Sequence, residues 1–426
     1  MIFVAVQTHA LTPAQLLWHN KLKTNPSLGD ALWTSYRIEG ELDVSAFVRA
    51  LARAVSRCDA LRIGVSRDTG SGKLCQWLRP EPTGQALVTC QNIRNGSEEK
   101  FARYARTAIA ADIASGYDLA TEYPFTFRLL RHSSRLHAFQ ATFSHLAVDA
   151  TGQSLFLADL WRNLAYVMGD AETEPAPSAS FLTAADAHAA ELAERGDTTA
   201  GFWQERNRMV RAMAGPRDAI SSNTYTQEGV TLFVEIDGPE LVELRERCRR
   251  ERYTEFQVAI AALAGAMFQV TTRELLGITI AVDARKAEER EVAGMFAIPL
   301  TLFLRRSDRR DVLLRGIREE VLALLRNRRV AGETLAGFRA DLAATDINID
   351  VAASYLKDLT FSQAVQVGQV LARPGAYDPV FTAAVGGSDL QVTSREDLLQ
   401  MILRLGPSFS APETSSTILK ELRARL

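Results

Sequence analysis

Residues 144–150 read Ser-His-Leu-Ala-Val-Asp-Ala and form the segment best suited to chemistry. His145 follows an apolar stretch and precedes a turn, so its imidazole can lie at the edge of a sheet. A neutral imidazole accepts or steers a proton near pH 7, which aspartate and lysine do only after large pKa shifts. Asp149, four residues later, can brace the turn. The pattern indicates proton handling at His145, although a histidine beside a turn more often has a structural role.

The elements around this segment follow from hydrophobic spacing. Residues 136–143 predict an apolar strand, paired through the hairpin 131–135 with a strand over 125–130. After the turn at 149–152, large apolar side chains at helical spacing predict a helix. Asp43 is a good N-cap for an earlier helix, and a further helix is expected over 98–113. The segment that carries His145 is therefore expected to join a strand to a helix.

Composition changes at Gly169–Ser180, which has two prolines, three acidic residues and no large apolar side chain. This is the best candidate for a linker. The second half resumes with strands over 230–236, 277–282 and 296–304, and Thr254 with Gln257 has capping-box spacing. We therefore predict an N-terminal lobe over 1–170, a linker over 171–180 and a C-terminal lobe over 181–426.

Bulk properties exclude several classes of function. The 426 residues carry a formal net charge of −2. The chain as a whole therefore has no positive electrostatic field that would attract nucleic acid or an anionic membrane. No apolar run reaches the roughly 20 residues that span a bilayer. The start of the chain lacks the basic region of a signal peptide, and the four cysteines lack metal-ligand spacing. We expect a cytoplasmic protein that binds neither nucleic acid nor membrane.

Two other motifs are set aside. Residues 68–73, Asp-Thr-Gly-Ser-Gly-Lys, look like a phosphate loop, but the spacing before Gly72 and the leucine after Lys73 do not fit. They predict a hairpin turn. The six histidines lack zinc spacing, and no metal is expected. His137 has the strand parity of His145 but lies roughly 26 Å away along an extended chain.

The segment 144–150 resembles the H-H-x-x-x-D-G signature of condensation domains and of chloramphenicol-acetyltransferase-like acyltransferases. Other segments resemble motifs of the same family in the same order, from about residue 11 to 385. These are Leu11–Trp18, Arg57–Arg62, Tyr117–Leu119 with Pro124-Phe125 and Arg128, Phe202-Trp203, Asp283–Arg285 with Gly294–Phe296 and Pro299-Leu300, and Arg373 with Asp378–Phe381. Each motif is loose, and their order is the stronger evidence.

The resemblance implies an α/β (α+β) fold of two chloramphenicol-acetyltransferase-like lobes, arranged as a V-shaped pseudo-dimer with a central tunnel. A phosphopantetheinyl thioester would enter from one side and the acceptor from the other. His145 would be the catalytic residue in the middle of the tunnel. Asp149 would be structural and paired with Arg285, a buried pair of the kind whose disruption typically costs about 3–5 kcal/mol.

Two departures from the signature affect the support of this site. Ser144 replaces the first histidine, which in the family looks more architectural than chemical. Ala150 replaces the glycine, so the turn must use ordinary backbone angles or carry strain. Gly152 could restore some freedom two residues later. With these changes catalysis remains possible.

The implied function is that of a stand-alone condensation-type acyltransferase of specialised-metabolite biosynthesis, such as nonribosomal peptide synthesis for an antibiotic. It would move an acyl or aminoacyl group from a carrier-protein thioester to an amine or hydroxyl. No cofactor would be bound permanently, the carrier protein would act in trans, and the protein would be a monomer. Two alternatives remain open: a non-catalytic condensation-like platform that recruits a partner, and an acyltransferase that uses a coenzyme A ester, whose phosphates favour basic residues nearby.

Overall fold

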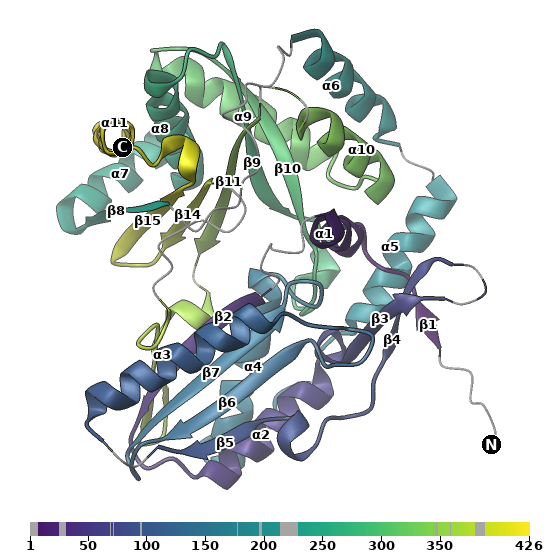
Figure 1. Ribbon diagram of the computed structural model, residues 1–426, viewed down its shortest axis with the longest axis vertical. Helices are drawn as coiled ribbons and strands as arrows, with labels where there is room; N and C mark the ends of the chain where they lie inside the picture. Colours follow the sequence, from purple (N-terminus) through teal and green to yellow (C-terminus); the bar gives the residue numbers. More distant parts are fainter. Residues whose placement is uncertain are drawn as a thin grey trace. The chain divides into compact units, whose positions relative to one another are not determined.

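The computed structural model (Figure 1) describes residues 7–24, 31–68, 70, 72–93, 96–176, 178–195, 198–213, 229–343, 345, 348–357, 359–379 and 388–426. Chain contacts divide it into two compact units. The first comprises Met1–Gly196, Arg285–Phe296 and Leu359–Val380, and the second comprises Asp197–Ala284, Ala297–Asp358 and Phe381–Leu426. Each unit is built around a six-stranded mixed sheet, which agrees with the predicted α/β class. The tunnel implied by the resemblance stays a prediction.

The sheet of the first unit has the strand order β12-β13-β2-β7-β6-β5. Only β5 and β6 are parallel among its neighbouring pairs. A smaller sheet orders β1-β4-β3. The strands are β1 (Thr8–His9), β2 (Ala31–Glu39), β3 (Ile63–Arg67), β4 (Leu74–Leu78), β5 (Thr89–Asn92), β6 (Phe125–Arg131), β7 (Leu136–Ser144), β12 (Val365–Val367) and β13 (Val370–Pro374). The helices are α1 (Pro13–Thr24), α2 (Val44–Arg57), α3 (Glu98–Ser115), α4 (Ala150–Met168) and α5 (Phe181–Arg195).

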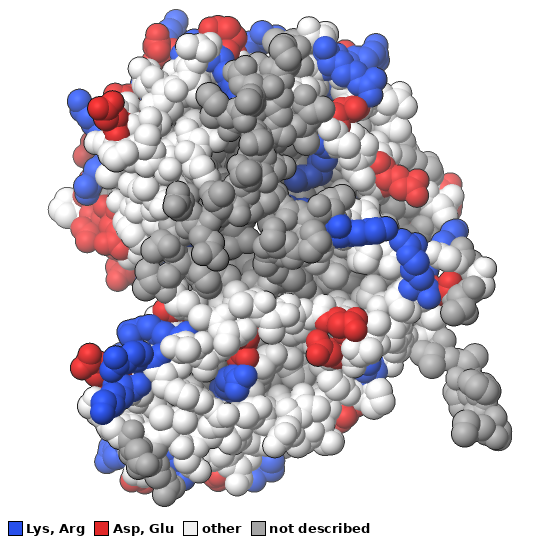
Figure 2. Space-filling model, viewed as in Figure 1, with Lys and Arg blue, Asp and Glu red and all other residues white. Residues whose placement is uncertain are grey.

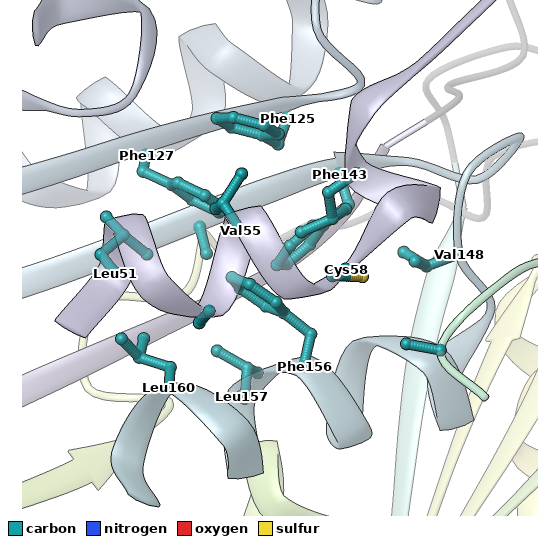
Figure 3. Close-up of a cluster of buried hydrophobic side chains, with 14 of the residues drawn as sticks. Leu51, Val55, Cys58, Phe125, Phe127, Phe143, Val148, Phe156, Leu157 and Leu160 are labelled. Atoms are coloured by element: carbon teal, nitrogen blue, oxygen red, sulfur yellow. The ribbon is translucent and has the colours of Figure 1, made fainter. Parts of the chain in front are cut away.

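Helices α2 and α4 cover one face of this sheet, and α3 covers the other (Figure 1). The alternation of β7 decides which side chains meet which helix. Phe143 packs on Phe156 of α4 with ring centroids 5.7 Å apart, whereas Gln140 points to the other face and donates to the Ala105 carbonyl of α3. Figure 3 shows the first cluster, where Leu51, Val55, Phe127 and Leu160 surround these rings. Burial of each such side chain contributes about 1.5–3 kcal/mol, so β7 is rigidly held along its length.

The second unit has the strand order β10-β9-β11-β14-β15-β8, with β11 parallel to both β9 and β14. Its strands are β8 (Val230–Asp237), β9 (Leu275–Asp283), β10 (Ala297–Arg305), β11 (Asn348–Lys357), β14 (Ser388–Ser394) and β15 (Leu398–Leu405). Its helices are α6 (Ala200–Met213), α7 (Gly238–Glu251), α8 (Glu255–Val270), α9 (Arg310–Arg326), α10 (Gly332–Ala343) and α11 (Pro412–Ala424). The capping box predicted at Thr254 and Gln257 begins α8.

The compact units differ from the predicted lobes 1–170 and 181–426. The segment Gly169–Ser180 has no helix or strand in its described residues. It is nevertheless held against α2, where Arg57 donates to the Pro175 carbonyl at 3.0 Å. The first unit continues through α5 and takes in residues 285–296, which lie between β9 and β10 of the second unit. The amino-acid composition does not indicate that such distant segments join the first unit.

Candidate active site

The turn that carries His145 begins where β7 ends and finishes where α4 begins. The Ser144 carbonyl accepts from Ala147 N at 3.0 Å and Val148 N at 3.3 Å. The buried Ser144 hydroxyl accepts from Leu146 N at 3.2 Å. A hydroxyl that accepts two residues ahead is a normal stabiliser of a tight turn. Ser144 therefore supports the turn at the position where the signature has its first histidine.

The His145 imidazole is half-buried and held through one of its nitrogens. Its Nδ1 lies 3.1 Å from the Val148 carbonyl oxygen. A carbonyl only accepts, so Nδ1 carries the hydrogen and, in the neutral ring, Nε2 keeps its lone pair. Nε2 has no hydrogen-bond partner among the residues that the structure describes. The ring is thus oriented as a proton acceptor at Nε2.

The environment of His145 favours the neutral ring. Burial lowers the pKa of His145, and the charge of Lys21 lowers it further, while the charge of Asp149 opposes the shift without reversing it. A lowered pKa means that the folded protein holds less of the protonated form at pH 7 than a free histidine would. The imidazole can therefore act as a base at neutral pH.

Helix α1 brings an aromatic side chain onto the imidazole. The Trp18 and His145 ring centroids are 4.4 Å apart, with the planes tilted by 45°. The start of α1 is fixed by a reciprocal cap, in which Thr12 N donates to Gln15 Oε1 and Gln15 N donates to the Thr12 hydroxyl. Gln15 Nε2 then donates to the Leu146 carbonyl at 2.9 Å. The cap ties α1 to the turn, so Trp18 lies against the ring one helical turn later.

Asp149 is the N-cap of α4, and both of its carboxylate oxygens are fully used. Oδ1 accepts from Gly152 N at 2.7 Å and Oδ2 accepts from Phe296 N at 2.9 Å. Arg285 donates to both oxygens, each at 2.9 Å. Burial alone would raise the pKa of Asp149, but the charge of Arg285 and these hydrogen bonds hold it below its usual value. The side chain is a buried, ionised brace rather than a proton carrier.

Residues 285–296, here called the strap, hold the start of α4 from outside its own sequence neighbourhood. Arg285 Nε donates to the Val292 carbonyl at 3.1 Å, and Asp149 N donates to the Gly294 carbonyl at 3.1 Å. A buried His188–Glu289 pair at 2.9 Å anchors the strap to α5. The Thr12 hydroxyl donates to the Met295 carbonyl at 3.0 Å, which joins the strap to α1. The strap thus links α1, α4 and α5 around His145.

The two departures from the signature are accommodated without strain. Ala150 is the first residue of α4 and has no positive φ, so a glycine is not required there. Gly152 does not supply left-handed freedom either, since its φ is also ordinary. Its role is close approach, because a Cβ on Gly152 would lie 2.7 Å from the Gly294 backbone. The expectation that Gly152 restores turn flexibility is wrong; it makes room for the strap.

Further family-like segments hold the fold. Asp59 accepts from Phe181 N at 2.9 Å and so caps α5, and Arg57 pairs with Asp159 at 3.2 Å. Arg128 pairs with Asp112 of α3. Trp203 is a core residue of the second unit. Val380 and Phe381 of the last segment lie outside the described residues.

Of the predicted site residues, the structure brings together His145, Asp149, Arg285, Ser144 and Ala150 in one place. The rejected phosphate-loop motif joins β3 to β4, where Gly72 N donates to the Asp68 carbonyl, and so has the predicted hairpin role. Sequence reasoning missed the roles of Trp18 and Gln15. The capping-box spacing of Thr12 and Gln15 was a signal for the start of α1, but nothing local could place that helix against residue 145.

Within the described residues, no cluster of His, Cys, Asp and Glu could hold a metal ion, and no helix is long and apolar enough to cross a membrane.

Comparisons with known proteins agree with the resemblance found in the sequence. The family model of the condensation domain matches residues 6–347. A linear gramicidin synthase of Brevibacillus parabrevis is 25% identical over 302 residues, which is 68% of this chain but 6% of that protein. A hybrid PKS-NRPS synthetase of Aspergillus fumigatus is 23% identical over 311 residues, 68% of this chain and 7% of that protein. The chain therefore spans only a small part of the curated relatives that it matches.

Solved structures with the same fold cover almost the whole chain. A variant of the starter condensation domain of rhizomide synthetase, in complex with C8-CoA, has a TM-score of 0.78 at 17% identity and covers 98% of this chain and 94% of that one. The X-domain in its complex with OxyB, from teicoplanin biosynthesis, has a TM-score of 0.75 at 17% identity and covers 98% and 93%. At these identities the likeness shows the fold.

Proposed function

Because the chain belongs to the condensation-domain family, we propose that it is an acyltransferase that moves an acyl or aminoacyl group from a thioester to an amine or hydroxyl at His145. The observation that carries the proposal is the fixed imidazole. Nδ1–H is bonded to the Val148 carbonyl, the ring is neutral at pH 7, and Nε2 can accept a proton.

The reaction needs one proton relay. The acceptor N–H or O–H donates its proton to Nε2 as its heteroatom attacks the thioester carbonyl. The tetrahedral intermediate then collapses, the C–S bond breaks, and the leaving thiolate takes the proton back from the imidazolium. General-base assistance of this kind is worth roughly 10²–10⁴ in rate, and the remainder comes from positioning the two substrates.

Asp149 and Arg285 serve the reaction by holding the turn. The Asp149 carboxylate accepts four hydrogen bonds from Gly152, Phe296 and Arg285, so it has no capacity left for a substrate proton. Its charge raises the pKa of His145 somewhat and thereby stabilises the imidazolium that forms in the reaction. Ser144 and Ala150 keep this arrangement, which favours a catalytic site over a degenerate one.

A covalent acyl-enzyme is not part of the proposal. Burial raises the pKa of the Cys58 thiol to about 12 and raises those of Cys75, Cys90 and Cys248, so none of them is a thiolate at pH 7. The Ser144 hydroxyl is fully buried and engaged in its turn. Direct transfer from the thioester to the acceptor is the simpler route.

A panel experiment tests this function. Carrier proteins and coenzyme A loaded with different acyl and aminoacyl groups are mixed with the purified protein and a set of amines and alcohols, and products are followed by mass spectrometry. Consumption of a thioester that depends on both the protein and the acceptor is the expected result. If no donor in the panel is consumed while the protein still binds a loaded carrier, the proposal is overturned in favour of the non-catalytic platform.

A further inference from the structure

Helix α5 carries a histidine whose partner is a buried carboxylate of the strap. Charged side chains usually lie at the surface, as Figure 2 shows for the Lys, Arg, Asp and Glu residues of the visible face. Glu289, in contrast, is 6% exposed, and His188 is 9% exposed. His188 Nε2 lies 2.9 Å from both Glu289 oxygens, so it carries the hydrogen that the carboxylate accepts. A carboxylate this deeply buried needs such a donor.

Glu289 in turn fixes the backbone next to Arg285. Its Oε2 accepts from Lys286 N at 2.7 Å, and its own N donates to the Lys286 carbonyl at 3.1 Å. Its carbonyl accepts from Val292 N at 2.9 Å. The Lys286 side chain is held as well, because its Nζ pairs with Glu191 of α5 at 2.9 Å. One carboxylate therefore closes the turn that begins at Arg285.

The His188 ring also contacts the other end of the strap. The ring centroids of His188 and Phe296 are 5.6 Å apart, with the planes at 65°. Phe296 N donates to Asp149 Oδ2 at 2.9 Å, and the Arg285 guanidinium lies over the Phe296 ring, 4.5 Å from its centroid. Both ends of the strap therefore hold Asp149. His188 contacts one end through Glu289 and the other end directly.

The strap has little room to move between the helices that it joins. A Cβ on Gly294 would lie 2.1 Å from the Phe181 ring of α5, and a Cβ on Gly152 of α4 would lie 2.7 Å from the Gly294 backbone. Asp149 N, at the start of α4, donates to the Gly294 carbonyl. Because close-packed interiors transmit strain, a shift of the strap also shifts the start of α4.

We propose that His188 is a positioning residue, which holds Asp149 in place through the strap and thereby orients the His145 imidazole. The inference rests on the proposed acyl transfer, because it assigns His188 to the support of that reaction's base. Asp149 caps α4 directly after Val148, whose carbonyl binds His145 Nδ1. A loosened strap would therefore reach the imidazole through two neighbouring residues.

The charges near His145 give the direction of the effect. Asp149 raises the pKa of His145, whereas burial and the charge of Lys21 lower it. Arg285 offsets the Asp149 charge while their ion pair is intact. A displaced Arg285 and a less tightly packed turn would both raise the pKa of His145 toward the ordinary 6.5. Loss of His188 thus has a readout at His145 that needs no substrate.

The first test follows the His145 imidazole by NMR in the full chain. A pH titration gives the pKa of His145, the ring nitrogen shifts give its tautomer, and the spectrum of His145→Ala assigns the signal. In His188→Phe the pKa should rise by about 0.5 or more, and the tautomers should mix. His188→Gln puts an amide donor in place of Nε2 and should keep the wild-type values. His132→Phe, in the hairpin at the other end of β7, is the matched control and should keep them too.

The second test separates kcat from KM. With a donor and acceptor that wild type turns over, His188→Phe should lower kcat about tenfold or more, because small misplacements of a catalytic group are costly. The KM values should change less than about twofold, since His188 positions the base and not the substrates. His188→Gln should recover most of the rate.

A double variant separates positioning from stability. His188→Phe leaves the buried Glu289 carboxylate without its donor, so this variant is destabilised. His188→Phe/Glu289→Leu removes the charge as well and should be more stable than His188→Phe. It still lacks the carboxylate that accepts from Lys286 N, so its kcat and the pKa of His145 should stay altered. If His188→Phe does not fold, the double variant takes its place in both tests.

A folded His188→Phe or double variant in which His145 has the wild-type pKa and tautomer would overturn the positioning role. A rate as high as that of His132→Phe would overturn it as well. The failure of the proposed function looks different. In that case wild type turns over no thioester, yet the NMR difference between His188→Phe and His132→Phe is still present.

Discussion

Two histidines at the two ends of one strand have opposite environments. His137 lies in β7 with 1% of its surface exposed, and neither ring nitrogen has a partner among the described residues. Burial lowers the pKa of His137 to about 4. His145, just after the same strand, is half-buried, with Nδ1 fixed by Val148 and Trp18 packed against the ring at a tilt. Both rings are neutral at pH 7, but only the second has a ring nitrogen fixed by a hydrogen bond.

The difference teaches that a depressed pKa alone does not mark a functional histidine. His137 is neutral because the core excludes water, and nothing orients its protons. His145 is neutral and oriented, and the orientation comes from a turn that Ser144 and Asp149 shape.

The largest expected effect on stability comes from the brace of the His145 turn. Arg285→Met leaves the buried Asp149 carboxylate without its cation and should lower the free energy of unfolding by about 3–5 kcal/mol. Urea unfolding followed by circular dichroism measures the change. Asp149→Leu/Arg285→Met removes both charges and should be less destabilised than Arg285→Met. A loss below about 1 kcal/mol for the single variant would show that the strap does not depend on this pair.

The buried His137 should make stability depend on pH. Its folded pKa of about 4 lies below the ordinary 6.5, so the folded state binds fewer protons there than the unfolded state. Stability is full above about pH 6.5 and falls through the window down to about pH 4, by about 3 kcal/mol in total. His137→Leu should be as stable as wild type at pH 7 and lose less at pH 4.5. Unfolding curves of both proteins at the two pH values check this, and equal losses would contradict it.

The smallest effect concerns the contact of Trp18 with His145. An aromatic contact is worth about 0.5–1.5 kcal/mol, so Trp18→Leu should lower kcat by about twofold to tenfold. The KM should change less, because Trp18 positions the imidazole rather than the substrate. Trp18→Phe keeps an aromatic ring and should recover most of the rate. The same kcat in Trp18→Leu and wild type would remove Trp18 from the positioning of His145.

Local patterns predicted the elements that present the site. The strands 125–130 and 136–143, the N-cap at Asp43 and the capping box at Thr254 are all confirmed, because each depends on neighbours within a few residues. The resemblance also supplied the pairing of Asp149 with Arg285, which are 136 residues apart.

The contacts between distant parts of the chain could not be predicted from the sequence. The strap returns to the first unit from between β9 and β10, and β12 and β13 complete the first sheet from far along the chain. Trp18 meets His145 only because Gln15 bonds the turn, and Gly152 matters only because the strap backbone passes close to it. Such contacts depend on tertiary packing, and no local spacing encodes them.

The acyl-transfer rate of His145→Ala decides whether this imidazole is catalytic. The variant is first shown to unfold at the same urea concentration as wild type, and His137→Leu is assayed beside it. We predict that His145→Ala loses roughly 10²–10⁴ in kcat while His137→Leu keeps the wild-type rate. A folded His145→Ala protein that transfers acyl groups at the full rate would contradict it.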